Sequence, residues 1–161
     1  MSSRKVVSWS EYHCLIEKLA YQVHRSGYVF NGIICLARGG LRVGDTLSRI
    51  FHCPLAILAT SSYRGQQRGE LIIANSITMT TPTLPDRLLL VDDLVDSGET
   101  IMQTLAWLKS RYRITEMRTA VLWYKSKSKY RPDYFGEVVS DNVWIEQPFE
   151  AYENFQFTDS L

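Results

Sequence analysis

The chain has few of the features that mark several other classes of protein. Its three cysteines, Cys14, Cys35 and Cys53, are odd in number and not at metal-ligand spacing, so neither a disulfide framework nor a zinc site is expected. No apolar stretch approaches the ~18 residues that suggest a membrane span, and the first residues lack the apolar run of a signal peptide. A formal net charge of +1 gives no overall attraction to nucleic acid. We therefore expect a cytoplasmic protein with reduced, buried cysteines, no transmembrane segment and no nucleic-acid partner.

The composition and the first helical pattern are those of an ordinary folded domain. The 161 residues are 45% apolar and 22% charged, and no repeat or Pro/Gly-rich linker divides them, so we expect one domain over residues 1–161. Ser8 and Glu11 match a helix capping box. Apolar residues then recur at helical spacing, and Gly27 is a plausible stop.

Apolar runs and helical patterns alternate along the rest of the chain. Runs typical of buried strands occupy residues 32–37, 54–61, 87–91 and 117–124, with short strand-like pieces over 138–145. Helical spacing recurs over 43–51 and 99–110, residues 62–69 predict a mobile polar loop, and residues 70–80 one or two strands of a hairpin. The alternation predicts an α/β fold with a mostly parallel sheet flanked by helices. Ligands of such sheets bind at the carboxyl ends of the strands.

The strand that ends at Val91 runs into a segment rich in chemistry. Asp92 and Asp93 follow it, and either could hold hydroxyl groups or a hydrated magnesium ion. The next residues, Asp96-Ser97-Gly98-Glu99-Thr100, open a helix, whose free N–H groups favour an anion. Neither a Walker loop nor a dinucleotide fingerprint is present. An ordinary capped loop would explain any one of these residues, but their ordered combination favours a phosphate site with carboxylates.

The string Val91-Asp92-Asp93-Leu94-Val95-Asp96-Ser97-Gly98-Glu99-Thr100 resembles the 5-phosphoribosyl 1-diphosphate (PRPP) motif of the type I phosphoribosyltransferases. The resemblance implies that Asp92 and Asp93 face the ribose hydroxyls and Mg²⁺, and that residues 96–100 cradle the 5′-phosphate. Glu99 should point away from the phosphate and contribute only its backbone. Asp96 is implied to accept the proton from purine N7, through a raised pKa or a hydrogen bond in the transition state. The family fold adds a small hood contributed by terminal segments.

Two further segments resemble the substrate loops of this family. Arg38 and Gly39 follow the first predicted strand, where the family binds diphosphate, although a turn with a surface arginine would look the same. Ser62 and Tyr63 resemble the flexible lid of the 6-oxopurine members, from which Arg68 would reach the diphosphate. A plain surface loop is the alternative for this second segment.

The segment Trp144-Ile145-Glu146-Gln147-Pro148-Phe149-Glu150 closely resembles the bacterial xanthine-guanine branch of the family. Alone, a Trp-Ile pair is more often part of a core than a base platform. The resemblance implies that Trp144 stacks on the purine, that the backbone at Ile145 reads its edge, and that Lys125 donates to the exocyclic O6.

These matches imply a function in purine salvage. The chain would transfer phosphoribosyl from PRPP to guanine, xanthine or hypoxanthine, with Mg²⁺, and would form a homodimer or homotetramer. A phosphoribosyltransferase for adenine or a pyrimidine is an alternative, against which Lys125 and Trp144 argue. A PRPP-sensing regulator on the same fold is another, against which the small net charge and the absence of an added DNA-binding domain argue.

Overall fold

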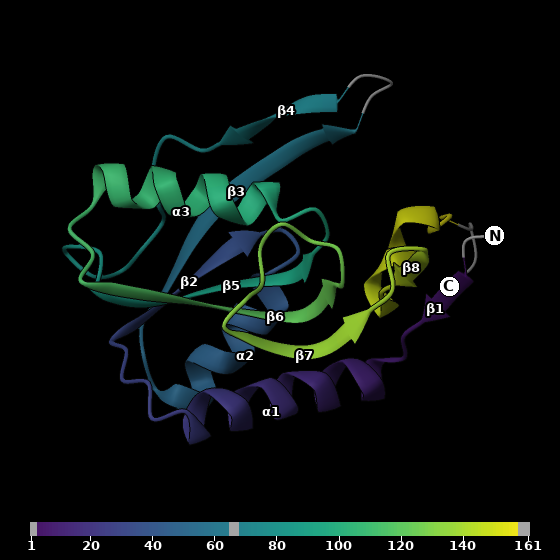
Figure 1. Ribbon diagram of the computed structural model, residues 1–161, viewed down its shortest axis with the longest axis horizontal. Helices are drawn as coiled ribbons and strands as arrows, with labels where there is room; N and C mark the ends of the chain where they lie inside the picture. Colours follow the sequence, from purple (N-terminus) through teal and green to yellow (C-terminus); the bar gives the residue numbers. More distant parts are fainter. Residues whose placement is uncertain (1–2, 65–67, 158–161) are drawn as a thin grey trace.

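A mostly parallel sheet forms the centre of the protein. The computed structural model describes residues 3–64 and 68–157, and within them a six-stranded sheet runs in the order β4-β3-β2-β5-β6-β7 (Figure 1). These strands are β2 (Gly32–Ala37), β3 (Leu55–Arg64), β4 (Arg68–Ile73), β5 (Arg87–Val95), β6 (Glu116–Lys125) and β7 (Tyr134–Val139). Neighbours pair in parallel except β3 and β4, which are antiparallel. The predicted α/β fold is confirmed.

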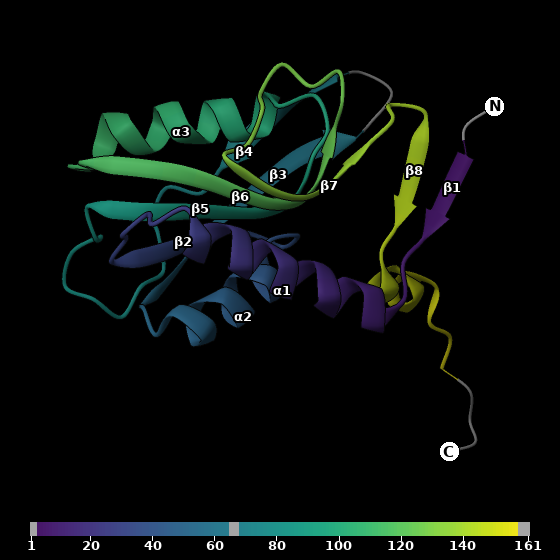
Figure 2. The same ribbon diagram turned by 60° about the horizontal axis from the view of Figure 1, so that its bottom comes forward.

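Helices cover both faces of the sheet, with α1 (Trp9–Arg25) and α2 (Leu41–Phe51) on one face and α3 (Glu99–Arg111) on the other (Figure 2). The predicted capping box starts α1, because Ser8 Oγ accepts from the Glu11 N–H and the Glu11 carboxylate accepts from the Ser8 N–H. Gly27, with φ 71°, follows the helix end as expected. Within the described ranges every helix is too short or too polar to cross a bilayer.

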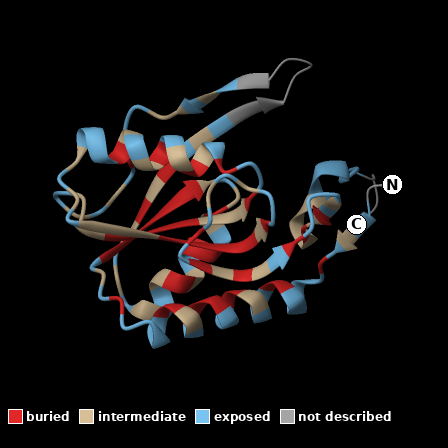
Figure 3. Ribbon diagram, in the orientation of Figure 1, coloured by how far each residue is buried: buried red, intermediate tan, exposed pale blue. Residues whose placement is uncertain are grey.

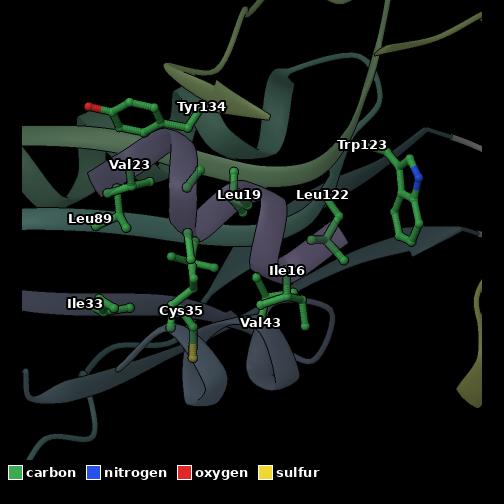
Figure 4. Close-up of a cluster of buried hydrophobic side chains, with 14 of the residues drawn as sticks. Ile16, Leu19, Val23, Ile33, Cys35, Val43, Leu89, Leu122, Trp123 and Tyr134 are labelled. Carbon is green, nitrogen blue, oxygen red and sulfur yellow. The ribbon is translucent and has the colours of Figure 1, made fainter. Parts of the chain in front are cut away.

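The central strands are buried on both sides, as parallel sheets require. Alternate residues of β2 face opposite layers: Cys35 joins the cluster under α1 and α2, and Leu36 joins the cluster under α3. Of the three cysteines expected to be buried, Cys35 is buried and Cys53 is partly buried, but Cys14 is exposed, so that part of the expectation is wrong. Figure 4 shows side chains of the first cluster, with Leu19 of α1 and Leu89 of β5 among them. Figure 3 shows buried residues concentrated along the central strands and the inner sides of the helices. This packing fixes the positions of the carboxyl ends of the central strands, which lie together on one side of the molecule.

A small second sheet lies beyond the carboxyl ends of the central strands (Figures 1 and 2). It pairs β1 (Ser3–Val6) in parallel with β8 (Val143–Glu146), and a 3-10 helix, η1 (Pro148–Asn154), follows. The ring of Phe149 packs edge-on to Tyr12 of α1, at a centroid distance of 5.9 Å. The Arg42 guanidinium of α2 lies 4.2 Å from the centroid of the same ring. The predicted hood from terminal segments is therefore confirmed, and it is anchored to both helices of one face.

Several predicted boundaries are wrong, among them the start of β7, which begins at Tyr134 and not at residue 138. Strand β5 continues to Val95, four residues beyond the predicted end, because β6 runs beside it and pairs Asp92 with Val121 and Leu94 with Trp123. Much of the backbone predicted as a loop over 62–69 is strand, because β3 extends to Arg64 and pairs with β4. The proposed lid and diphosphate side chains, Ser62, Tyr63 and Arg68, lie outside the part of the structure in which side chains are described.

Candidate active site

A cavity of about 400 Å³ lies between the carboxyl ends of the central strands and the hood. It brings together predicted site residues from four separate segments: Arg38, Gly39, Asp92, Asp93, Asp96, Ser97, Gly98, Thr100, Lys125, Trp144 and Ile145. Thr60 and Leu71, from the β3–β4 hairpin, line it as well. Residues more than 100 positions apart therefore share one site.

The two neighbouring carboxylates stand on the last part of β5. The Asp92 Oδ1 accepts the Asp93 N–H at 2.9 Å, and the Asp93 Oδ1 accepts the Leu94 N–H at 2.7 Å. Burial of its carboxyl, followed by the nearby Asp93 charge, raises the pKa of Asp92 well above its ordinary value. A divalent cation would offset both effects, since it stabilises the charged form of each carboxylate.

The carboxylate pair fits a magnesium ion held jointly with substrate. Among the described residues, no cluster of three or more His, Cys, Asp or Glu side chains is suited to a metal. Mg²⁺ is commonly bound through one or two carboxylates, with waters and substrate phosphates completing its shell. Asp92 and Asp93 match that donor set.

The loop between β5 and α3 places the start of a helix at the cavity. Gly98 has φ 88° and directly precedes α3, so the N–H groups at the helix start lie beside the cavity-lining residues Ser97 and Thr100. The Glu99 N–H donates to Ser97 Oγ at 3.3 Å. The Glu99 side chain is exposed and accepts from Lys129 Nζ at 3.3 Å. Glu99 is not among the cavity-lining residues.

The segment after β6 supports this loop from behind. The Lys129 N–H donates to the Ser97 carbonyl at 3.0 Å. A Cβ on Gly98 would come within 2.8 Å of both Ser128 Oγ and Tyr130 N. No sequence signal indicated this role, because residues 126–130 have no recognisable motif and their contacts are with a loop about 30 positions earlier.

The loop between β2 and α2 packs tightly against β5. A Cβ on Gly39 would lie 2.4 Å from Asp93 Oδ1, and one on Gly40 would lie 2.6 Å from the Val91 carbonyl oxygen. The peptide bond between Ala37 and Arg38 is cis. Arg38 is exposed at the cavity wall, so its guanidinium is available to an anionic ligand.

The third wall carries the predicted base-binding residues. Trp144 is 53% exposed, and Ile145 is buried beside it. Lys125 ends β6 and is also buried. Its ammonium donates to the carbonyls of Ser140 (3.3 Å), Asp141 (3.4 Å) and Val143. Lys125 therefore ties down the loop that leads into β8, in addition to lining the cavity.

The structure also identifies a site residue that the sequence analysis did not single out. Gln147, inside the C-terminal motif, lines the cavity and donates from Nε2 to Asp93 Oδ2 at 2.5 Å. Gln147 is part of the Trp-Ile-Glu-Gln-Pro string, so the motif could have indicated it. The resemblance, however, implies roles only for Trp144 and Ile145 of that string.

Similarity to known proteins agrees with this geometry. Residues 8–154 match the phosphoribosyl transferase domain family. The xanthine-guanine phosphoribosyltransferase of Idiomarina loihiensis is 29% identical over 151 residues, which are 92% of this chain and 88% of that protein. A purine phosphoribosyltransferase structure from Pyrococcus horikoshii superposes with a TM-score of 0.77 at 26% identity, covering 99% of this chain and 100% of that one.

A second solved structure has the same fold. The xanthine-guanine-hypoxanthine phosphoribosyltransferase of Helicobacter pylori superposes with a TM-score of 0.80 at 24% identity, over 94% of this chain and 96% of that one. The fold match, the sequence match over residues 8–154 and the PRPP motif lining the cavity agree with one another. This chain therefore belongs to the phosphoribosyl transferase domain family.

Proposed function

We propose that this chain transfers the phosphoribosyl group of PRPP to a 6-oxopurine base, giving a nucleoside monophosphate and diphosphate in purine salvage. One observation carries the proposal: a single cavity combines the β5–α3 loop, the Asp92–Asp93 pair, Arg38 and the exposed Trp144. The similar proteins named as xanthine-guanine and purine phosphoribosyltransferases support a purine as the base.

The sugar substrate fits the two sides of the cavity formed by β2 and β5. The 5′-phosphate accepts hydrogen bonds from the start of α3 and from Ser97 and Thr100. Asp92 and Asp93 hold the ribose hydroxyls and Mg²⁺, and the ion supplies positive charge that offsets the diphosphate when it is bound. Arg38 contacts the diphosphate with its planar guanidinium.

The base fits the side formed by the hood. Trp144 stacks on the ring, and the backbone at Ile145 reads its edge. Lys125 donates to O6 by exchanging one of its present carbonyl contacts for the base oxygen. This exchange would also free part of the loop over 140–143, because the same ammonium holds that loop.

Transfer then requires placement and charge stabilisation more than covalent help from the protein. A base nitrogen forms the new bond to C1′, and the diphosphate leaves with the electron pair of the old bond. Asp96, exposed at the cavity wall, accepts the proton from purine N7. The roles of Ser62 and Tyr63 as a lid, and of Arg68 at the diphosphate, stay predictions.

Turnover on a panel of bases tests the proposal and its alternatives. With PRPP and Mg²⁺, we expect diphosphate release with guanine, xanthine or hypoxanthine, and at least about 100-fold less with adenine and uracil, because a site built to hydrogen-bond one base rejects others strongly. A preference for adenine or uracil would overturn the assignment of the base. PRPP binding without turnover on any base would favour the regulator, and salt-sensitive RNA binding would support that reading.

Three broader predictions accompany the enzyme. We propose a single domain over residues 1–161, a homodimer or homotetramer and a cytoplasmic location. Light scattering at several protein concentrations measures the assembly, and fractionation of cells that express the protein measures the location.

A further inference from the structure

One hydrogen bond joins the hood to the carboxylate pair. Gln147 Nε2 donates to Asp93 Oδ2 at 2.5 Å across 54 positions of sequence. A carboxylate can only accept, so the amide nitrogen must face it. Charge-assisted hydrogen bonds of this kind are stronger than neutral ones.

Gln147 is held at both its backbone and its side chain. Its N–H donates to Glu150 Oε1 at 3.0 Å, and its carbonyl accepts from the Glu150 N–H at the start of η1. The residue is 8% exposed, and the buried Oε1 has no hydrogen-bond partner among the described residues. A buried carbonyl without a partner costs free energy, so this orientation of the amide is retained at some expense of stability.

Asp93 is correspondingly confined on three sides. Its Oδ1 accepts the Leu94 N–H, and the Gly39 backbone leaves no room for a methyl group beside it. Gln147 binds the other oxygen. The carboxylate is thus fixed by the β2–α2 loop, by its own strand and by the hood.

We propose that Gln147 is a positioning residue for PRPP binding: it orients Asp93 toward the ribose and its magnesium, although it belongs to the segment that forms the base site. The inference rests on the proposed function. In this proposal, binding of the sugar substrate depends on Gln147, which lies only three positions after the base-binding residue Trp144.

Calorimetric titration with Mg²⁺ and PRPP, combined with steady-state KM values for PRPP and for the base, tests the role. For Gln147→Leu we expect PRPP affinity to fall by about 10- to 100-fold, the range for loss of a hydrogen bond to a charged group. The KM for the base should change by less than about threefold. The melting temperature should stay close to that of the wild type, because the substitution also removes the partnerless carbonyl.

Two further variants separate this role from general support of the hood. Gln147→Glu keeps the size of the side chain but replaces the hydrogen-bond donor by an acceptor. It should therefore weaken PRPP binding at least as much as Gln147→Leu does. If the leucine variant does not fold, the glutamate variant still tests the role. Glu146, the last residue of β8, directly precedes Gln147 and forms an ion pair with Arg4. Glu146→Gln breaks this ion pair and should leave PRPP affinity unchanged.

Distinct outcomes would overturn the proposal. Unchanged PRPP affinity in both Gln147 variants, equal losses for PRPP and base, or the same loss in Glu146→Gln would each show that the hydrogen bond does not position Asp93. Wild-type binding of PRPP without turnover would overturn the proposed function alone, because the titration would still measure Gln147. Absence of PRPP binding by the wild type would overturn both.

Discussion

The backbone of Gly39 touches the carboxylate of Asp93: a Cβ at Gly39 would lie 2.4 Å from Asp93 Oδ1. We expect Gly39→Ala to displace that carboxylate and to raise the KM for PRPP by about 10- to 100-fold, since ångström-scale misplacement in a site can cost that much. Gly27→Ala is the matched control, because Gly27 has a positive φ but nothing within 4 Å of its Cβ position. It should lower the melting temperature and leave the KM unchanged. An unchanged KM in Gly39→Ala would mean that Asp93 adapts.

A second glycine shapes the phosphate loop. Gly98 has φ 88°, and a Cβ there would come within 2.8 Å of Ser128 Oγ and Tyr130 N. Gly98→Ala should cost about 1–2 kcal/mol of stability from the left-handed backbone alone, and should weaken PRPP binding by about tenfold or more because the loop must shift. Calorimetry and thermal melting measure the two effects separately. Normal PRPP affinity in the variant would argue that the support from residues 128–130 is not required.

The raised pKa of Asp92 predicts a pH-dependent stability. The folded protein favours the protonated form of the Asp92 carboxyl. The contribution of Asp92 to the free energy of unfolding is therefore fully present below its ordinary pKa of 3.8, and it is lost as the pH rises through the raised pKa of the folded state. Asp92→Asn stays neutral and should gain melting temperature over the wild type between acid and neutral pH, by about 2–4 °C for each kcal/mol. Added PRPP and Mg²⁺ should stabilise the wild type but not the variant. A difference in melting temperature that does not change with pH would contradict the shift.

Asp96 is the proposed proton acceptor, and its substitution should affect chemistry more than binding. Asp96→Asn keeps the size of the side chain but not its basicity, so we expect kcat to fall by about 100- to 10,000-fold, the usual contribution of a general base. PRPP affinity, measured by calorimetry, should change by less than about tenfold. Equal losses in turnover and affinity would refute the general-base role.

Substitutions at Trp144 and Lys125 should distinguish the loss of base stacking from the loss of structural support for the hood. Trp144 is 53% exposed, so Trp144→Phe should keep stability while Trp144→Ala loses base affinity by about 5- to 150-fold, the equivalent of ~1–3 kcal/mol of stacking. Lys125→Met removes three contacts with the loop over 140–143 and should lower the melting temperature as well. Steady-state KM for the base and thermal melting distinguish these results.

Local patterns were the reliable part of the sequence analysis. The Ser8–Glu11 capping box and the strand over 32–37 depend on residues close in sequence, and both are confirmed. The end of β5 was missed because Asp92 and Asp93 are poor strand formers on their own. Their strand conformation comes from pairing with β6, a partner known only from the fold.

Composition of the site was largely predictable, but its internal contacts were not. Motif residues such as Arg38, Asp96 and Trp144 line one cavity, since the carboxyl ends of parallel strands meet at one edge. The carbonyl contacts of Lys125 and the hydrogen bond from Gln147 to Asp93 join segments up to 54 positions apart. No local pattern encodes such contacts, because they depend on the packing of the complete fold.

The pairing of β1 with β8 has a consequence for biosynthesis. Arg4 stands opposite Trp144, so the partner of the first strand leaves the ribosome about 140 residues later. At roughly 5–20 residues per second, β1 waits roughly 7–28 s for that partner. The sheet core can pack during this interval, but the wall of the cavity that carries the tryptophan forms only after this later segment has been synthesised.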